Sequence, residues 1–171
     1  MPRPAANLLG LLTVLAENRV DFIVIGGVAA ALQGAPIATF DLDLVHSREP
    51  DNLERLLAAL CDLDASYREH HDPRLTPTAA HLSGPGHHLL MTSAGPLDLL
   101  GTVTNRRGYA DLVASTFFVE LTPGLSVRVL DLAMIITLKS ELAGEKDLAQ
   151  LPILRRTLEE RRTHPGPTRE D

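Results

Sequence analysis

Two aspartates separated by one residue, Asp41 and Asp43, are the side chains in this sequence best suited to chemistry. They lie in an apolar segment that we expect to be a strand, and residues two apart in a strand point to the same side. Two carboxylates on one side can hold a hard divalent cation, Mg²⁺ or Mn²⁺. The pattern therefore predicts a metal site at Asp41 and Asp43, with Leu42 and Leu44 facing the core.

A glycine pair, Gly26 and Gly27, follows an apolar segment upstream of these acids. A strand that enters a glycine turn and then a helix presents unpaired backbone N–H groups beside the positive end of that helix. This arrangement suits a phosphate, and glycine lets the backbone approach it closely. We expect Gly26 and Gly27 to bind the phosphates of a nucleotide.

The segment from Phe22 to the acidic pair resembles the nucleotidyltransferase superfamily related to DNA polymerase beta, whose signature is a Gly-Gly or Gly-Ser turn followed by two acids spaced by one residue. Thirteen residues separate Gly27 from Asp41. The resemblance implies a third carboxylate on a later strand, and Asp98, flanked by apolar residues, is the candidate for this metal and catalytic role. A turn or surface aspartate is the alternative for Asp98. The resemblance also implies that Thr39 contributes to nucleotide binding.

The C-terminal part of the chain resembles the AbiEii-like toxin nucleotidyltransferases and their relatives. The similarity lies in Lys139 and in the segment Glu145-Lys146-Asp147-Leu148. It implies that Lys139 and Asp147 belong to the nucleotide site and that a cognate antitoxin is a partner. Ordinary helix surface is the alternative for Lys139 and Lys146.

The resemblance implies an activity, the transfer of a nucleoside monophosphate from a nucleoside triphosphate to a hydroxyl acceptor with loss of pyrophosphate. Asp41 and Asp43 would hold magnesium, and Asp98 would orient or deprotonate the acceptor hydroxyl and share a second metal. The acceptor is open among a tRNA end, a protein side chain and a small molecule. The resemblance to toxin enzymes favours RNA or protein.

The chain departs from the AbiEii-like pattern at Ile37, where an arginine is usual, and at Gln150, where an acid is common. These departures, together with the formal charge of −6, keep a second function open, a non-catalytic member of the fold that binds a nucleotide or a partner protein and regulates it.

Other readings of the same residues are weaker. The run Asp41-x-Asp43-x-Val45 also fits the aspartate nucleophile of haloacid-dehalogenase-like phosphatases, but it follows a Gly-Gly helix and no later Gly-Asp pair completes that site. A dinucleotide-binding turn would need the G-x-G-x-x-G spacing. The adjacent pairs His70-His71 and His87-His88 point to opposite faces in a strand, so neither chelates zinc easily.

The elements that must position these residues indicate a mixed α/β (α+β) domain of the nucleotidyltransferase fold, a sheet flanked by helices and finished by two C-terminal helices. We expect helices over residues 5–18, from Gly26 to Gly34 and from Pro50, and a long loop over 65–86. Strands are expected over 21–25, 38–46, 87–92, 97–103, 117–121 and 125–130, with turns at Ala94-Gly95-Pro96 and Pro123-Gly124. Asp131 is the expected N-cap of the first C-terminal helix, which breaks near Ala143-Gly144; the second begins around Asp147 and is bent or restarted at Pro152.

Length, composition and charge limit the domain organisation and the possible partners of the chain. The chain has 171 residues, 44% of them hydrophobic, and we expect one compact unit, with a nucleotidyltransferase core over 1–130, a helical segment over 131–162 and a disordered tail over 163–171. Its single cysteine, Cys61, excludes an intrachain disulfide and fits a reducing cytoplasm. No apolar run is long enough to span a membrane. The negative charge restricts nucleic-acid contact to local arginine groups, such as Arg106-Arg107.

Overall fold

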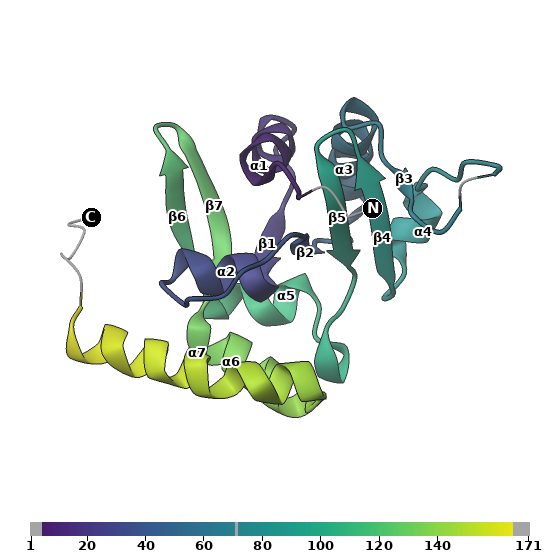
Figure 1. Cartoon of the computed structure of the whole chain (residues 1–171). Coiled ribbons are helices and arrows are strands. Elements are labelled where there is room, and N and C mark those ends of the chain that lie inside the picture. Colours follow the sequence, from purple (N-terminus) through teal and green to yellow (C-terminus); the bar gives the residue numbers. More distant parts are fainter. Residues whose placement is uncertain (1–4, 71, 166–171) are drawn as a thin grey trace.

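Apolar segments of the chain build one mixed sheet, shown in Figure 1. The protein is described by a computed structural model, which covers residues 5–70 and 72–165. Within these residues seven strands follow the order β3-β4-β5-β2-β1-β7-β6. The strands are β1 (Phe22–Ile25), β2 (Leu42–His46), β3 (Ser66–Tyr67), β4 (His87–Thr92), β5 (Gly95–Leu100), β6 (Thr116–Thr122) and β7 (Leu125–Leu130).

Helices flank the sheet, as the sequence predicts. They are α1 (Leu8–Glu17), α2 (Gly26–Leu32), α3 (Pro50–Asp62), α4 (Ala79–Ser83), α5 (Tyr109–Leu112), α6 (Leu132–Leu142) and α7 (Glu145–Thr163), with short 3-10 turns at Thr104–Arg106 and Val113–Ser115. Figure 1 shows α1 and α3 in the upper part of the view, beside the strands, and α6 and α7 at the bottom. The expected mixed α/β fold with two C-terminal helices is confirmed.

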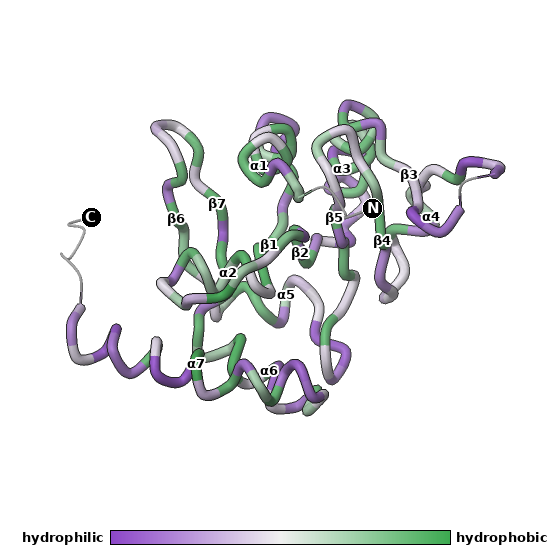
Figure 2. Tube along the Cα trace, in the orientation of Figure 1, coloured by the Kyte–Doolittle hydropathy of each residue, from purple (hydrophilic) through white to green (hydrophobic). Residues whose placement is uncertain are grey.

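The central strands are apolar, and Figure 2 shows this for β1, in contrast to the hydrophilic C-terminal half of α7. Strand β1 pairs with β2 antiparallel and with β7 parallel, and β2 pairs with β5 parallel. Leu42 and Leu44 of β2 are fully buried, as expected from their alternation with the two aspartates. Pairing on both sides of β1 and β2 therefore fixes the strands that frame the candidate site.

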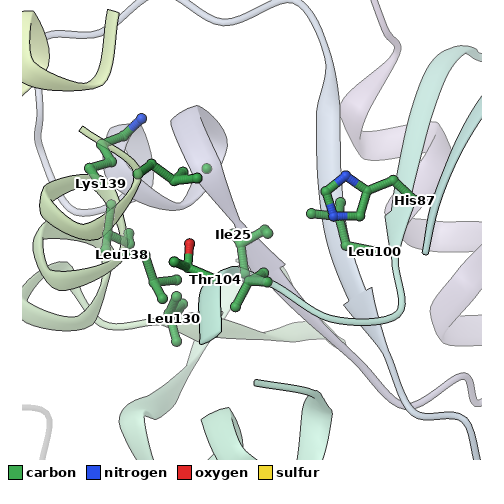
Figure 3. Close-up of a pocket in the computed structure, with 11 residues that line it drawn as sticks. Ile25, His87, Leu100, Thr104, Leu130, Leu138 and Lys139 are labelled. Atoms are coloured by element: carbon green, nitrogen blue, oxygen red, sulfur yellow. The ribbon is translucent and has the colours of Figure 1, made fainter. Parts of the chain in front are cut away.

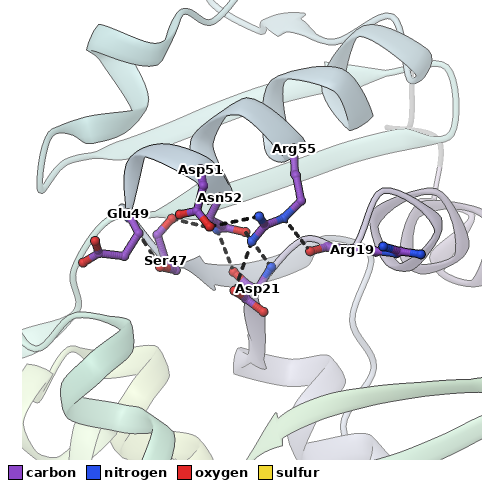
Figure 4. A network of polar contacts seen from close by, with 7 residues as sticks. All are labelled: Arg19, Asp21, Ser47, Glu49, Asp51, Asn52 and Arg55. Carbon is purple, nitrogen blue, oxygen red and sulfur yellow. Dashed lines mark hydrogen bonds and ion pairs between the residues drawn. The ribbon is translucent and has the colours of Figure 1, made fainter.

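Polar side chains fasten the start of β1 to α3 (Figure 4). Asn52 is fully buried, accepts a hydrogen bond from the backbone N–H of Asp21 at 2.7 Å and donates to the carbonyl oxygens of Asp21 and Ser47. Arg55 adds an ion pair to Asp21 and a hydrogen bond to the carbonyl oxygen of Arg19. A buried amide that satisfies three backbone groups holds this end of β1 in place.

Several expected boundaries are wrong. Strand β2 begins at Leu42, so Asp41 lies in a bend before the strand rather than within it. The reason is the register: β1 pairs with β2 only as far as Asp43 and β5 pairs with it only as far as Leu42, so Asp41 has no partner in either strand. The alternation of side chains between the two faces of a strand therefore does not set the direction of the Asp41 side chain, contrary to the prediction.

The segment 65–86 is more ordered than the expected loop. It contains β3, which pairs with β4, and α4, which buries Leu82 completely. Strand β5 runs from Gly95 to Leu100, whereas the expected strand runs over 97–103. It begins earlier because Thr92 pairs with Gly95, which makes the turn between β4 and β5 shorter than predicted. The composition of this region, rich in Pro, His and Gly, obscures these elements, although Thr78 caps α4 by accepting a hydrogen bond from the His81 N–H.

The C-terminal helices match the prediction at their caps. The Asp131 carboxylate accepts a hydrogen bond from the Met134 N–H at 2.7 Å, and Ala143 takes a left-handed conformation at the break. Helix α7 begins at Glu145 and continues through Pro152, without the expected restart; Leu151 and Leu154, on either side of the proline, are buried and anchor both parts. Residues 166–171 of the expected tail lie outside the described residues.

The histidines behave as the strand period predicts. His88 is buried and its Nδ1 lies 2.8 Å from the Tyr67 hydroxyl, whereas the neighbouring His87 is exposed on the opposite face. His46 is also buried, with Nε2 at 2.9 Å from the Leu82 carbonyl oxygen. His71 lies outside the described residues.

No helix in the described ranges combines the length and the apolar character needed to cross a bilayer.

Candidate functional site

One row of residues crosses the sheet and carries the candidate site. Asp43 of β2 pairs with Ile25 on one side and with Asp98 of β5 on the other. Asp98 in turn pairs with Leu89 of β4, whose carbonyl oxygen accepts a hydrogen bond from the Arg68 N–H at 3.0 Å. Directly opposed residues point to the same face of a sheet. The register therefore brings Asp43 and Asp98 together, as the sequence predicts.

Burial and mutual repulsion raise the pKa of Asp43 to about 7. Removal from water is the largest cause, followed by the negative charges of Asp98 and Asp41. Burial also raises the pKa of Asp98, against the opposing charge of Arg68. The negative charge of Asp41 raises the pKa of both carboxyls, although Asp41 precedes the strand. Clustered acids of this kind are relieved by a bound cation.

Arg68 forms an ion pair with Asp98, and both side chains are mostly buried. Sequence reasoning missed this residue because it lies just after β3, in the segment expected to be a loop. No spacing pattern marks it, since its guanidinium reaches Asp98 only because the sheet places β4 between β3 and β5. The ion pair fixes the Asp98 carboxylate beside a permanent positive charge.

The donor set fits a divalent cation in part. Carboxylate oxygens are the ligands that magnesium prefers, and a protein site often supplies only one or two of them beside substrate phosphates. Asp41 and Asp43 offer such a pair. Over residues 5–70 and 72–165, however, no group of three or more His, Cys, Asp or Glu side chains is placed to hold a metal ion. The metal role of Asp98 stays a prediction.

Gly26 and Gly27 are each explained by a different close contact. Gly26 has φ +65, and a Cβ there would lie 2.5 Å from Oδ2 of Asp43. A Cβ on Gly27 would lie 2.9 Å from the Cβ of Thr39. Thr39 donates a hydrogen bond from Oγ1 to the Asp41 carbonyl oxygen at 3.2 Å. Gly26 therefore gives room to Asp43, and Gly27 gives room to the loop that carries Asp41.

A substitution at Gly26 tests this close approach. Gly26→Ala should lower the free energy of unfolding by more than the roughly 1 kcal/mol expected from a positive φ alone, because its methyl group also meets the Asp43 carboxylate. Gly124→Ala is the matched control, since Gly124 has φ +83 and no atom within 4 Å of the added Cβ. Urea denaturation measures both variants. Equal losses would show that Gly26 serves the turn and not the aspartate.

The C-terminal helices bring one cation toward the acids. Lys139 of α6 forms an ion pair with Asp147 of α7 at 3.2 Å, and both side chains are largely buried, at 17% and 24% exposed. The charge of Lys139 lowers the pKa of Asp43, the smallest of the contributions there. Lys146 is exposed, as the helix-surface alternative predicts. The structure thus places Lys139 and Asp147 beside the site without testing their role in nucleotide binding.

The two departures from the AbiEii-like pattern also have a place in the structure. Ile37 is partly buried and packs against the hydrophobic core, where an apolar side chain is suited. Gln150 lies half-buried on α7. Of the arginine groups considered for nucleic-acid contact, Arg107 is paired with Glu141 at 2.6 Å.

An apolar cavity of about 160 Å³ adjoins the acids. Figure 3 shows Lys139 on one side of it, His87 and Leu100 on the other, and Ile25 and Leu130 between them. Gly26 also lines this space, so the cavity reaches the glycine turn. Its walls come from the sheet and from α6, which explains why sequence patterns did not reveal it.

Comparison with known proteins supports the fold. No protein-family model matches the chain, and no curated protein matches it. Among solved structures, the chain is similar to TM1012 from Thermotoga maritima, whose crystal structure is described as that of a "putative nucleotidyltransferase". The TM-score is 0.53 at 19% sequence identity, and the match covers 90% of this chain and 91% of the other. The chain therefore shares the fold of that protein over nearly its whole length.

Proposed function

We propose that this protein is a metal-dependent nucleotidyltransferase that moves a nucleoside monophosphate from a nucleoside triphosphate to a hydroxyl acceptor. The observation that carries the proposal is the pairing of Asp43 with Asp98 across β2 and β5, with Asp41 close by and Gly26 packed against the Asp43 carboxylate. Buried, mutually repelling carboxylates cost stability unless a cation uses them. Similarity of fold to TM1012 supports the same class.

Asp41 and Asp43 would hold Mg²⁺ or Mn²⁺, which in such sites neutralises the charge of the triphosphate during displacement. Asp98 would orient the acceptor hydroxyl and accept its proton, a role that suits a carboxyl whose pKa burial raises. Gly26 and Gly27 would approach the phosphates with their backbone. Thr39 would hold the loop that carries Asp41.

Lys139 and the apolar cavity would receive the rest of the nucleotide. The Lys139 ammonium lies at the edge of the cavity and is held by Asp147, so it has a fixed position from which to bind phosphate oxygens. The apolar walls, which include Ile25, Leu100 and Leu138, suit the faces of a nucleobase. Gly26 lines the cavity and packs against Asp43, so a triphosphate bound at the acids would extend past Gly26 toward the cavity.

The acceptor follows from the resemblance to toxin enzymes, which favours an RNA end or a protein side chain and implies a cognate antitoxin. The test is to incubate the purified protein with labelled ATP, CTP, GTP and UTP in a cell extract and to ask which fraction carries label. We expect label in RNA or protein. Label confined to small molecules would overturn that preference, and no label above that of the Asp41→Ala/Asp43→Ala double variant would overturn the enzyme.

A second function has its own supporting observation. The Arg68–Asp98 ion pair makes the site less negative than the family pattern implies. Ile37, an apolar residue where an arginine is usual, makes it less positive. A non-catalytic protein that binds a nucleotide and regulates a partner would show these features. It would bind a nucleoside triphosphate in the same way as the enzyme and leave every fraction of the extract unlabelled.

A further inference from the structure

The strongest unexplained feature of the site is the arginine that no motif includes. Arg68 is 14% exposed, and its Nη2 binds the Asp98 carboxylate. Its other terminal nitrogen, Nη1, is buried and has no hydrogen-bond partner in the part of the chain that the structure describes. Asp98 is thus the one side chain, among the described residues, with which Arg68 forms an ion pair or hydrogen bond. The guanidinium is placed to serve this carboxylate.

We propose that Arg68 is a built-in counter-charge for Asp98, so that the site takes one divalent cation, held by Asp41 and Asp43, where three free carboxylates would take two. The inference rests on the proposed function. It makes Arg68 a positioning residue, which acts through Asp98 and touches neither substrate nor metal.

Charge supports the assignment. Asp41, Asp43 and Asp98 carry three negative charges when ionised, and Arg68 cancels one of them. The nearby Lys139 is already paired with Asp147, so the three acids keep the charge that a single divalent cation balances. A second cation at Asp98 would have to sit within a few ångströms of the guanidinium. Repulsion at about 4 Å near a protein surface weakens such binding by roughly a thousandfold for each unit of added charge.

Geometry supports it as well. Arg68 continues the row of Leu89, Asp98 and Asp43 across the sheet, since its N–H bonds the Leu89 carbonyl oxygen and Leu89 pairs with Asp98. Its side chain therefore leaves the backbone on the face that carries the two aspartates. In agreement with an occupied Asp98, no trio of acidic or other metal-binding side chains is arranged around a common point within the described ranges.

Counting bound manganese tests the inference without any measure of activity. The protein is titrated with Mn²⁺ in the absence of nucleotide, which would itself bind the ion, and free ion is followed by electron paramagnetic resonance. We expect one Mn²⁺ per chain in the wild type, two in Arg68→Met, and one in Arg68→Lys, which keeps the charge. Arg74→Met is the matched control, because Arg74 lies in the same segment and pairs with the exposed Asp64; it should bind one.

The outcomes separate the two proposals. Two Mn²⁺ in the wild type, or one in a folded Arg68→Met variant, would overturn the role of Arg68 while the metal site itself stands. Wild-type protein that binds no Mn²⁺ would overturn the metal site of the proposed function and this inference with it. A wild-type count of two overturns the role of Arg68 even where Arg68→Met does not fold.

Discussion

Asp43→Asn should make the metal-free protein more stable at pH 8, although it removes a residue at the centre of the site. The unfolded chain releases the Asp43 proton near its ordinary pKa of 3.8, whereas burial and the charges of Asp98 and Asp41 hold the folded pKa at about 7. Between these values the folded protein binds more protons, so the free energy of unfolding falls as pH rises, and above pH 7 the penalty is constant.

The size of the effect follows from the difference between the folded and the unfolded pKa of Asp43. Each pH unit is worth about 1.4 kcal/mol, so the penalty in the wild type reaches up to about 4 kcal/mol at pH 8. Asparagine has nearly the same shape and carries no charge, so the variant should gain most of this amount and lose the part of the pH dependence that Asp43 contributes. Urea denaturation from pH 4 to pH 8 without metal measures both.

Two histidines act in the opposite direction over part of the same range. Burial lowers the pKa of His46 and lowers that of His88 to about 4. Their contribution to stability is therefore present above pH 6.5 and is lost as pH falls toward the folded pKa. Both histidines remain in the variant, so the difference between the two profiles isolates Asp43. Asp64→Asn, at an exposed aspartate, should leave the profile unchanged, and an Asp43→Asn profile parallel to the wild type would contradict the account.

The same substitution should lower nucleotide transfer by about a thousandfold in kcat/KM, the scale on which loss of one preorganised electrostatic group slows an enzyme. An amide keeps the shape of the side chain but cannot supply the charge that holds a cation. Initial rates of label transfer to the acceptor fraction, at saturating Mg²⁺, measure the loss.

The expected gain in stability and the expected loss of activity in Asp43→Asn are informative together because they have opposite signs. A variant that is more stable and almost inactive shows that the acids are kept for function at the expense of the fold. Asp64→Asn should retain the full rate. A loss of less than tenfold in a folded Asp43→Asn variant would mean that Asp43 is not a ligand of the reacting group.

The sequence was most informative where a residue type has a local cause. Asp131 caps α6, and Gly124 turns the β6–β7 hairpin with a positive φ; both effects operate within a few residues and were predicted. The convergence of Asp43 and Asp98 was expected from the resemblance to the nucleotidyltransferase superfamily, which implies a third carboxylate on a later strand. Local patterns thus indicated the elements, and the resemblance indicated the centre of the site.

Long-range pairing decided what local patterns could not. Asp41 falls outside β2 because neither β1 nor β5 pairs with the chain before Leu42, which is a matter of register between strands. Arg68 reaches Asp98 only through the order of β3, β4 and β5, and no composition or period predicts that order. The cavity beside Lys139 likewise needs α6 to lie against the sheet. These features depend on contacts between distant segments.

The central claim, a nucleotide and metal site at Asp41 and Asp43, is tested most directly by isothermal titration calorimetry. Each of the four nucleoside triphosphates is titrated into the wild type and into the Asp41→Ala/Asp43→Ala double variant, with and without Mg²⁺. We predict that at least one triphosphate binds the wild type only with the metal present, and that the folded double variant binds none. Equal binding by the wild type and the double variant, or binding that ignores the metal, would contradict the site.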